Sequence, residues 1–493
     1  CSSLEVALRG IAWSMTHSVL VLRDGPGGVL AASSDTLALA RSVYEHCYFI
    51  RHFLSRYSSA NNHLIGELAG LSCLSAVFDF GEASSDWLAF ANTELAREAA
   101  LQVSRHGVAR EQATHYQLEV LDYLLFAWLV GRSCGSELDG VVLQRVCAML
   151  RFLRAITPQG GALPQLGDSD EGTVNRFRAG ALEDVDAELM ATVEHVFAPD
   201  PGHVPAAEKG FWYRLIATAR TPEIPPRASE AVQPPERAQT RVESFAEDGY
   251  AVLAAADLFV VFDAGPLGYT SIAAHGHADA LAFCAAWQAQ WWLVDPGTYA
   301  YHSDPAHRAY FRGTAAHNTV TVDGLDQSTP GGPFMWIRHA PAHLAGAGTL
   351  GDGTLWAEGY HDGYRRLGLR HRRRIELSGA NSFSIIDRFE RAAGRQTRVN
   401  LHFHFDPCIE VSLHGVACTA SRDGTDVVLS ATLDPAWQWR TVRGSTAPLL
   451  GWYSPGLGRK VPCWTLQGSA IIDSAAVART TFTFGTKPPA AGH

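Results

Sequence analysis

Hydrophobic positions in the first half of the chain recur every three or four residues. Six such segments follow one another, separated by short Gly, Ser or Asp breaks: 3–15, 35–57, 63–78, 87–104, 112–132 and 138–156. This period places apolar side chains on one face of an α-helix. Because consecutive helices with short connections pack as hairpins, the pattern predicts a helical domain over residues 1–220.

After residue 240 the pattern changes to alternation of apolar and polar positions, broken by Asp-Gly and Gly-Ala-Asn turn signals. The segments concerned are 250–265, 318–324, 354–363, 371–390, 398–407, 426–433 and 479–487. Short strands without intervening helices are typical of an antiparallel sandwich, which we expect over residues 241–493. The stretch 219–240 is rich in proline and charge and predicts a linker.

Composition and charge exclude several classes of protein. With 493 residues, 47% hydrophobic and 18% charged, the chain is typical of a globular protein of two domains. A net charge of −10 argues against a nucleic-acid partner, which needs an excess of Lys and Arg. The apolar run 123–131 is shorter than the roughly 20 residues of a membrane span, so we expect none. The basic run 365–377 is expected to be a solvated strand face rather than a binding patch.

Candidate chemistry in the second half centres on "HGHADAL", residues 275–281. Alternation in a strand would turn His275 and His277 to the same face. Asp295 follows the apolar run "WWLV", and His317 is expected to start the next strand. The set His277, Asp295 and His317 suits four-coordinate zinc with one position left for water, whereas the alternative is a group of hydrogen-bonded histidines at a domain interface.

The first half offers a polar group at a predicted helix start. In "NNHLIGE" one asparagine is explained as a helix cap, but His63 beside the second is not. Downstream, Tyr116 lies on an otherwise apolar helix, where a lone tyrosine is more often part of the core than a catalyst.

Five motifs in order resemble the heparinase II/III family of polysaccharide lyases, which includes bacterial heparin and oligoalginate lyases. They are "NNHLIGE", "EQATHY", "HGHADALAF", "VDPGTYAY" and "YFRGTAAHNTVTVDG". The likeness covers most of the chain. It implies an N-terminal (α/α) toroid, short at its start, then a C-terminal antiparallel β-sandwich, with the active site in the cleft between them. It further implies a structural Zn²⁺, an acidic polysaccharide substrate and a periplasmic or secreted location, and it allows for a homodimer.

The resemblance also implies roles for individual residues. Asn62 and His63 would bind the substrate carboxylate, Tyr116 would transfer the proton and His275 would be the histidine of the catalytic cleft. The family's zinc ligands correspond to His277, Asp295 and His317. Its second tyrosine is assigned to Tyr301, with Tyr299 and Tyr310 as competitors. The expected substrate-binding residues are Asn61, Glu67, Gln112, Tyr299, Tyr310 and Arg312.

The implied reaction is β-elimination at a uronic acid, which leaves a 4,5-unsaturated uronate end. Two alternatives stay open. A toroid can also carry a glycoside hydrolase, here with Glu67 and Glu111 as the paired carboxylates. A non-catalytic protein of glycan binding or polysaccharide assembly could use the same residues without turnover.

Overall fold

The chain forms two compact units. The computed structural model describes residues 2–24, 34–175, 185–197, 208–218, 240–269, 271–391 and 394–486. The helical unit holds Cys1–Arg110, Tyr116–Phe152 and Gly172–Pro234, and the β unit holds Glu111–His115, Leu153–Glu171 and Pro235–His493. Two segments of the predicted helical domain therefore belong to the β unit. The expected linker at 219–240 lies outside the described residues except for Thr240.

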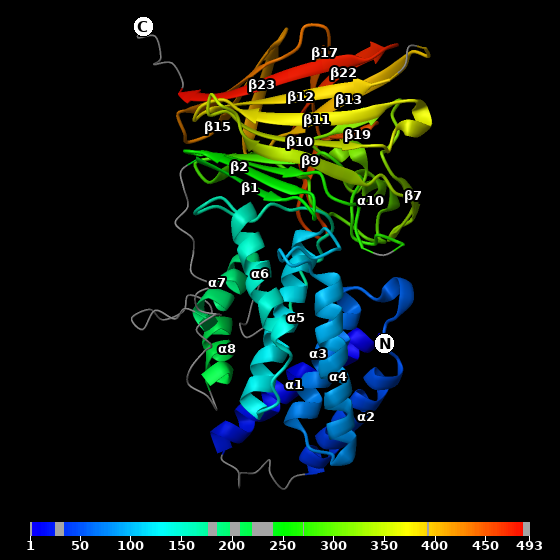
Figure 1. The fold of residues 1–493 in the computed structure, drawn as a ribbon, viewed down its shortest axis with the longest axis vertical. Coiled ribbons are helices and arrows are strands. Elements are labelled where there is room, and N and C mark those ends of the chain that lie inside the picture. The colour runs from blue at the N-terminus through cyan, green and yellow to red at the C-terminus, as the bar shows by residue number, and fades with distance from the viewer. Residues whose placement is uncertain are drawn as a thin grey trace. The chain divides into compact units, whose positions relative to one another are not determined.

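Helices cover most of the described first half of the chain (Figure 1). They are α1 (Ser3–Asp24), α2 (Ser34–His52), α3 (Asn62–Val77), α4 (Glu82–Gln102), α5 (Thr114–Cys134), α6 (Gly140–Ile156), α7 (Val185–Phe197) and α8 (Glu208–Thr218), with a 3₁₀ turn η1 (Tyr57–Ser59) after α2. The first six correspond to the six periodic segments. Among the described residues, no helix combines the length and apolar character that a membrane crossing requires.

Helix α3 is the centre of the helical unit. Nearly all of its side chains are buried, so it lacks the polar face of a surface helix. Glycine allows α1 to approach closely: a Cβ on Gly70 would stand 2.6 Å from the Cβ of Ala7, and one on Gly66 would stand 2.5 Å from Leu4. The polar N-terminus of α3 is thereby held on a rigid helix.

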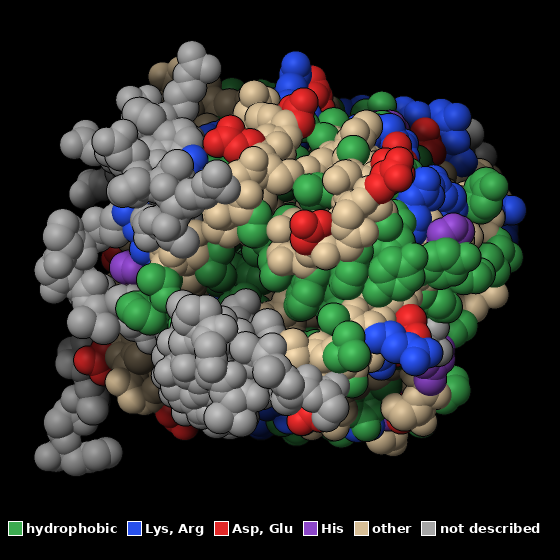
Figure 2. All heavy atoms as spheres, turned by 90° about the horizontal axis from the view of Figure 1, so that it is seen from below, with side chains coloured by type: hydrophobic (Ala, Val, Ile, Leu, Met, Phe, Trp, Pro, Cys, Tyr) green, Lys and Arg blue, Asp and Glu red, His purple; other side chains and the backbone are tan. Residues whose placement is uncertain are grey.

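Helix α2 carries apolar side chains on two faces. Val43, Cys47 and Ile50 are fully buried in the core with α1, α3 and α4. Tyr44 and Tyr48, one turn apart, are 41% and 51% exposed. Figure 2, which views the molecule from below, shows hydrophobic side chains gathered on its surface. The three-and-four period is correct for α2, but packing decides which apolar stripe is covered.

The β unit consists of antiparallel sheets (Figure 1). A five-stranded sheet has the order β1 (Thr240–Phe245), β2 (Tyr250–Ala255), β3 (Leu258–Asp263), β4 (Phe283–Trp287) and β5 (Gln290–Leu293). An eight-stranded sheet has the order β14 (Ile409–His414), β15 (Ala417–Arg422), β16 (Val427–Thr432), β23 (Ala476–Thr486), β12 (Ser382–Glu390), β11 (Arg370–Leu377), β10 (Leu355–His361) and β9 (Ala342–Thr349). A four-stranded sheet has the order β17 (Gln438–Arg443), β22 (Trp464–Ile472), β13 (Thr397–His404) and β6 (Val320–Val322).

Smaller elements join these sheets. The two-stranded ribbons are β7 (Thr329–Gly332) with β8 (Met335–Arg338), β18 (Ser445–Thr446) with β19 (Leu449–Leu450), and β20 (Trp452–Gly456) with β21 (Arg459–Pro462). The short helix α10 (Pro305–Phe311) and the 3₁₀ turns η2 (Thr314–Ala316) and η3 (Arg365–Leu367) interrupt the strands. Alternation alone did not predict α10, which begins at an Asp-Pro cap.

The three large sheets share one hydrophobic core. Val260 of β3, Ile385 of β12, Leu401 of β13 and Phe482 of β23 all belong to it and are fully buried. Strands β1 and β2 lie against β9 and β10 (Figure 1). Layers of this kind give a rigid scaffold for the loops at their edges.

The prediction of a solvated face for the basic run 365–377 is only half correct. In β11, Arg370, Arg372 and Arg374 are partly exposed and pair with acidic side chains of the surface. The alternate residues His371 and Arg373 are fully buried. The reason is the period of two, which turns every second residue of the strand towards the core.

Those two buried residues share one carboxylate. Asp387 of β12 accepts a 2.6 Å hydrogen bond from Nε2 of His371 and bonds of 2.7 and 3.1 Å from Arg373. Burial alone would raise the pKa of Asp387, but the Arg373 charge and the His371 hydrogen bond lower it. The carboxylate is thus ionised and compensated inside the core.

Removing the guanidinium by Arg373→Met leaves the Asp387 charge buried with a single histidine partner. We expect a loss of about 3–5 kcal/mol in the free energy of unfolding of the β unit, measured by denaturant titration. The double variant Arg373→Met/Asp387→Leu should recover part of this loss, because no uncompensated charge remains, although the carbonyls of Leu281 and Asn318 still lack the donor that Arg373 supplied. A single variant as stable as the wild type would contradict the account.

Candidate functional site

The segment HGHADAL is an irregular loop that leads into β4, not the expected strand. Residues 271–275 form a turn, and β4 begins only at Phe283. Alternation therefore does not explain why His275 and His277 act together. Instead both rings bond the same carboxylate: Nδ1 of His275 lies 3.4 Å and Nε2 of His277 lies 2.9 Å from oxygens of Asp168.

Gly276 makes this conformation possible. A Cβ at this position would lie 1.5 Å from the carbonyl oxygen of Leu267, closer than any side chain allows. The carbonyl of Gly276 accepts a 2.9 Å hydrogen bond from the indole N–H of Trp336. The glycine between the two histidines thus serves close backbone packing.

Two non-glycine residues in the left-handed region flank the loop. Ala273 has φ 47° and Leu281 has φ 63°, and both side chains are fully buried. This conformation is rare for a bulky residue and costs of the order of 1–3 kcal/mol, so it persists only where the surroundings impose it. Strain of this kind is characteristic of functional sites.

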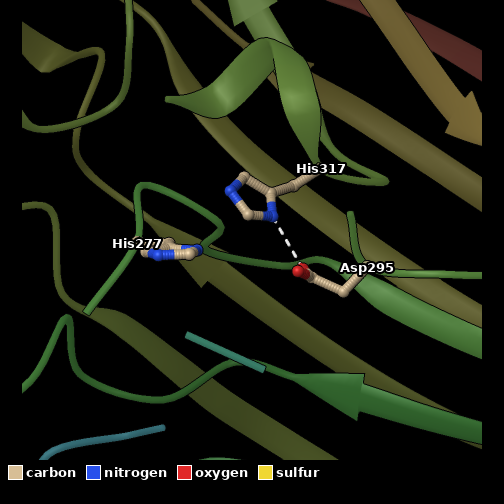
Figure 3. Close-up of side chains that lie close together, drawn as sticks. All are labelled: His277, Asp295 and His317. Atoms are coloured by element: carbon tan, nitrogen blue, oxygen red, sulfur yellow. Dashed lines mark hydrogen bonds and ion pairs between the residues drawn. The ribbon is translucent and has the colours of Figure 1, made fainter. Parts of the chain in front are cut away.

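His277, Asp295 and His317 form a buried group with the composition of a metal site (Figure 3). Each offers one ligand atom, and the three atoms lie within 4.8 Å of one another. Asp295 accepts a 2.7 Å bond from Nδ1 of His317. Nδ1 of His277 and Nε2 of His317 are buried and have no hydrogen-bond partner among the described residues. Two imidazoles with unused nitrogens beside a carboxylate fit zinc.

Different local structures hold these three side chains. Asp295 follows β5 as expected, and its Oδ1 accepts from the backbone N–H of Gly297 at 3.2 Å. His317 ends the turn η2, three residues before β6, rather than starting that strand. Its neighbour Asn318 donates from Nδ2 to the carbonyls of Phe283 and Val294. The group is therefore tied to both β4 and β5.

Burial sets the charge of His277. The pKa of His277 is lowered, chiefly because burial penalises the charged ring. A neutral imidazole is the form that binds metal. With Nε2–H donating to Asp168, the lone pair of His277 lies on Nδ1, the nitrogen without a partner among the described residues.

Asp168 is the residue of this site that the sequence did not reveal. It is fully buried, and Arg308 of α10 donates from both terminal nitrogens to its two oxygens, with 2.8 Å for the Nη2 bond. Burial alone would raise the pKa of Asp168, but the Arg308 charge and two histidine hydrogen bonds lower it well below its usual range. The segment "LGDSDEG" has no period, so its only signal was a polar turn after the last strong helix.

His275 is buried among charged and aromatic groups. Its Nε2 lies 3.8 Å from Glu111, and its ring meets Phe334 edge-on at 5.9 Å between centroids. Burial would lower the pKa of His275, but the Asp168 hydrogen bond and the Glu111 and Asp168 charges outweigh it and raise the value. The carboxylates beside the ring thus oppose the effect of burial on its charge.

Tyr301 lies in the same aromatic group as His275. Its ring contacts Phe334 at 4.9 Å, and the Arg308 guanidinium lies 5.1 Å from its centroid. The competing tyrosines face elsewhere: Tyr299 lies 4.3 Å from the amine of Lys460, and the hydroxyl of Tyr310 accepts from two backbone N–H groups. Of the three tyrosines, Tyr301 is the one that shares the Phe334 ring with His275, and its role stays a prediction.

Arg312 and Gln112 are buried polar residues of the β unit with unused groups. Arg312 donates from Nη1 to the carbonyls of Gly332 and Pro333, while its Nε and Nη2 have no partner among the described residues. Burial and the Arg308 charge lower the pKa of Arg312 to about 10. Gln112 has φ 58°, and its Oε1 has no partner within the described part of the chain. Both retain unused hydrogen-bonding groups, and their role in substrate binding stays a prediction.

The expected site residues of the helical unit surround the start of α3 and of α5. Asn61 caps α3 by accepting from the N–H of His63, and Asn62 is buried in its first turn. Glu67 is fully buried, with both oxygens bonded to Ser55 at 2.7 Å. Tyr116, in the first turn of α5, is 4% exposed. Asn61, Asn62 and His63, which are consecutive in the chain, thus form the N-terminal end of α3.

A cavity of about 310 Å³ reaches the metal-compatible group from within the β unit. Asp295 and Cys284 line it, together with Arg422, Tyr453 and the turn 160–165. The cavity therefore touches one of the three candidate ligands, Asp295.

Two family models match the chain. Residues 31–185 match "Heparinase II/III N-terminus", and residues 237–479 match "Heparinase II/III-like, C-terminal". The chain belongs to the heparinase II/III family. Members of this family are polysaccharide lyases. No match was found among curated proteins.

Solved structures of heparinases share the fold of this family member. A heparinase III is similar at 15% identity with a TM-score of 0.72, covering 98% of this chain and 69% of its own. A mutant of heparan sulfate lyase HepC from Pedobacter heparinus is similar at 15% sequence identity with a TM-score of 0.70, and the match covers 99% of this chain and 69% of the HepC chain. A further heparinase III is similar at 17% sequence identity with a TM-score of 0.67, and the match covers 92% of this chain and 63% of that heparinase chain. These likenesses confirm a helical toroid followed by an antiparallel β-sandwich.

The variant Gly276→Ala should disrupt the histidine loop, because its Cβ would collide with the Leu267 carbonyl. We expect a loss of about 3 kcal/mol in the free energy of unfolding, together with reduced zinc content after purification, measured by denaturant titration and elemental analysis. Gly485→Ala, whose Cβ would meet no atom within 4 Å, is the matched control and should change neither quantity. Equal behaviour of the two variants would reject this role of Gly276.

Proposed function

We propose that this protein is a polysaccharide lyase that cleaves a uronic-acid-containing polysaccharide by β-elimination. The product would carry a 4,5-unsaturated uronate end. The observation that carries the proposal is the family membership of both halves together with a buried His275 that shares Asp168 with the metal-compatible group. A substrate of this kind outside the cell would place the enzyme in the periplasm or the medium.

Neutralising the substrate carboxylate is the first requirement of the reaction. The hydrogen at C5 of a uronate is too weakly acidic for a side chain to remove unless the developing enediolate is stabilised. In the proposal, the amide of Asn62 and the ring of His63 donate to that carboxylate. One well-placed donor of this type is worth about 3–4 kcal/mol in the transition state. Both residues stand at the N-terminus of α3, where the helix dipole also favours an anion.

Proton transfer is assigned to Tyr116 and His275. As the C5–H bond breaks, its electrons form the C4–C5 double bond, the C4–O bond breaks, and the leaving oxygen takes up a proton. When the two groups are syn, Tyr116 starts as the tyrosinate, accepts the C5 proton and passes it to the leaving oxygen. For the opposite epimer, His275 accepts the C5 proton, and Tyr116 as the phenol donates its own proton to the leaving oxygen. Tyrosine, with an ordinary pKa near 10, acts as an acid without assistance but needs positive charge nearby to act as a base.

A bound Zn²⁺ is assigned to His277, Asp295 and His317. When bound, it would cross-link the histidine loop to the end of β5 and to η2, and so fix the backbone on which His275 stands. The unused nitrogens of both histidines support this assignment. The role proposed for the metal is structural.

The hydrolase alternative is less well supported. An acid–base pair needs carboxylates that can face substrate and water. Glu67 is fully buried, and both of its oxygens accept hydrogen bonds from Ser55. Burial raises the pKa of Glu67, although the Ser55 bonds oppose this. Its environment is that of an interior structural residue.

The variant Tyr116→Phe tests the lyase directly. Heparan sulfate, chondroitin, hyaluronan, alginate and bacterial acidic exopolysaccharides are each incubated with the enzyme, and the ultraviolet absorbance of the conjugated double bond is recorded. On the polymer that is cleaved, we expect the variant to lose about 10²–10⁴-fold in kcat, because the leaving oxygen no longer receives a proton.

Tyr48→Phe is the matched control, since Tyr48 is exposed on α2, and it should retain full activity. Retention of activity by Tyr116→Phe would reject the assigned role. New reducing ends without absorbance would indicate hydrolysis, and binding without either signal would indicate a glycan-binding protein.

Zinc removal and Asp295→Ala should destabilise the β unit in the same way. A metal at 100 times its Kd adds about 2.7 kcal/mol to the free energy of unfolding. We therefore expect a chelator to lower the Tm of the wild type, and Asp295→Ala to have a lowered Tm that the chelator does not change further. Asp257→Ala, in the exposed turn between β2 and β3, should respond to the chelator as the wild type does. A wild-type Tm insensitive to chelation would contradict the metal assignment.

A further inference from the structure

We propose that Asp168 is a positioning residue that fixes the tautomers of His275 and His277 with one carboxylate, and thereby couples metal binding to the orientation of the cleft histidine. This inference rests on the proposed function, in which His275 serves the reaction and His277 binds the metal. It adds a residue that none of the five sequence motifs contains.

The hydrogen-bond geometry determines where the ring protons lie. An ionised carboxylate only accepts hydrogen bonds, so each ring nitrogen that faces Asp168 must carry a hydrogen. Oδ1 faces Nε2 of His277 at 2.9 Å, and Oδ2 faces Nδ1 of His275 at 3.4 Å. Each ring therefore carries a hydrogen on the nitrogen that faces Asp168, and the opposite nitrogens, Nδ1 of His277 and Nε2 of His275, point away from this carboxylate.

The two nitrogens that point away from Asp168 suit two different tasks. Nδ1 of His277 is buried without a hydrogen-bond partner among the described residues and belongs to the group with Asp295 and His317. Nε2 of His275 is the nitrogen on the side of Glu111, 3.8 Å away. One carboxylate thus directs the ligand nitrogen of the first ring to the metal-compatible group and turns the other nitrogen of the second ring towards Glu111.

Asp168 can perform this task because it is itself held on every side. Arg308 donates to both oxygens, which fixes the plane of the carboxylate. The backbone N–H of Asp168 donates to the carbonyl of His275 at 3.0 Å, and Thr298 lies 3.4 Å from Oδ1. Any displacement of the His275 backbone is therefore transmitted to the carboxylate that orients His277.

Arg308 extends the network to the second tyrosine. Its guanidinium lies 5.1 Å from the ring centroid of Tyr301 and 5.3 Å from that of Phe334, and it donates to the Pro333 carbonyl. The carboxylate of Asp168 therefore stands at the centre of a group that includes the histidine loop, α10 and the turn between β7 and β8.

The β unit contains a natural control for this arrangement. Asp387 is also a buried carboxylate that bonds one arginine and one histidine, Arg373 and His371. Its partners lie on regular strands of the eight-stranded sheet. Loss of either carboxylate removes the same kinds of bond from the same unit, but of the two only Asp168 bonds histidines of the proposed site directly. Asp387 reaches the site only through Arg373, which donates to the backbone carbonyls of Leu281 and Asn318.

The test compares Asp168→Asn with Asp387→Asn. An amide has a single acceptor oxygen, so the substituted side chain can satisfy one ring N–H and must oppose the other with its own NH₂ group. We expect Asp168→Asn to lose about 10–100-fold in Zn²⁺ affinity, measured by competition with a chromogenic chelator. We also expect kcat on the cleaved polymer to fall while KM stays unchanged. Asp387→Asn should lower the Tm but keep both the Zn²⁺ affinity and kcat.

Further outcomes separate the possibilities. Asp168→Glu, which restores the charge, should regain Zn²⁺ affinity relative to Asp168→Asn. Equal losses of Tm in the two asparagine variants, with Zn²⁺ affinity and kcat retained in both, would overturn the proposal and make Asp168 a purely structural carboxylate. If the wild type cleaves no uronate polymer, the proposed function fails, while the Zn²⁺ affinities still decide for or against the link between Asp168 and His277.

Discussion

A single buried negative charge organises the histidine group of the β unit. A carboxylate removed from water is strongly disfavoured unless it is paired and hydrogen-bonded. Asp168 meets this condition only because Arg308 binds both of its oxygens and His275 and His277 add further bonds. Its partners come from segments more than a hundred residues away in the chain. The need to compensate one charge therefore fixes several loops at once.

A buried carboxylate has a different effect on the structure where its partners lie on regular strands. Around Asp387 the partners lie on paired strands, whose register the main-chain hydrogen bonds already define. Around Asp168 the partners lie in a turn and on the short helix α10, where no sheet fixes the side chains. A buried ion pair changes little in the arrangement of paired strands, whereas in irregular structure it determines how the loop side chains are placed.

The division between rigid scaffold and chemical loops follows from these constraints. The three large sheets of the β unit enclose a common apolar core, and the candidate ligands stand where strands end or turns begin. Asn318 illustrates the connection: its amide bonds the carbonyls of Phe283 and Val294 while its neighbour His317 faces Asp295. Left-handed backbone at Ala273 and Leu281 is tolerated because the core holds it in place.

The sequence by itself determined the types of element, the order of the two halves and most residues of the proposed chemistry. The helical period of 3.6 residues and the strand period of 2 residues can be recognised within a single segment, because they reflect which residues of that segment must be buried together. The motifs around His277, Asp295 and His317 identified a group that the structure brings together. The family resemblance added the roles that periodicity cannot supply.

Only the tertiary structure decided which distant segments meet. It showed that α2 buries Val43 rather than Tyr44, and that the pair of histidines lies in a loop rather than a strand. It also revealed Asp168 and Arg308, which lie 140 residues apart and carry no local pattern. The physical reason is that charge compensation and close packing act through space, whereas hydrophobic period acts along the chain.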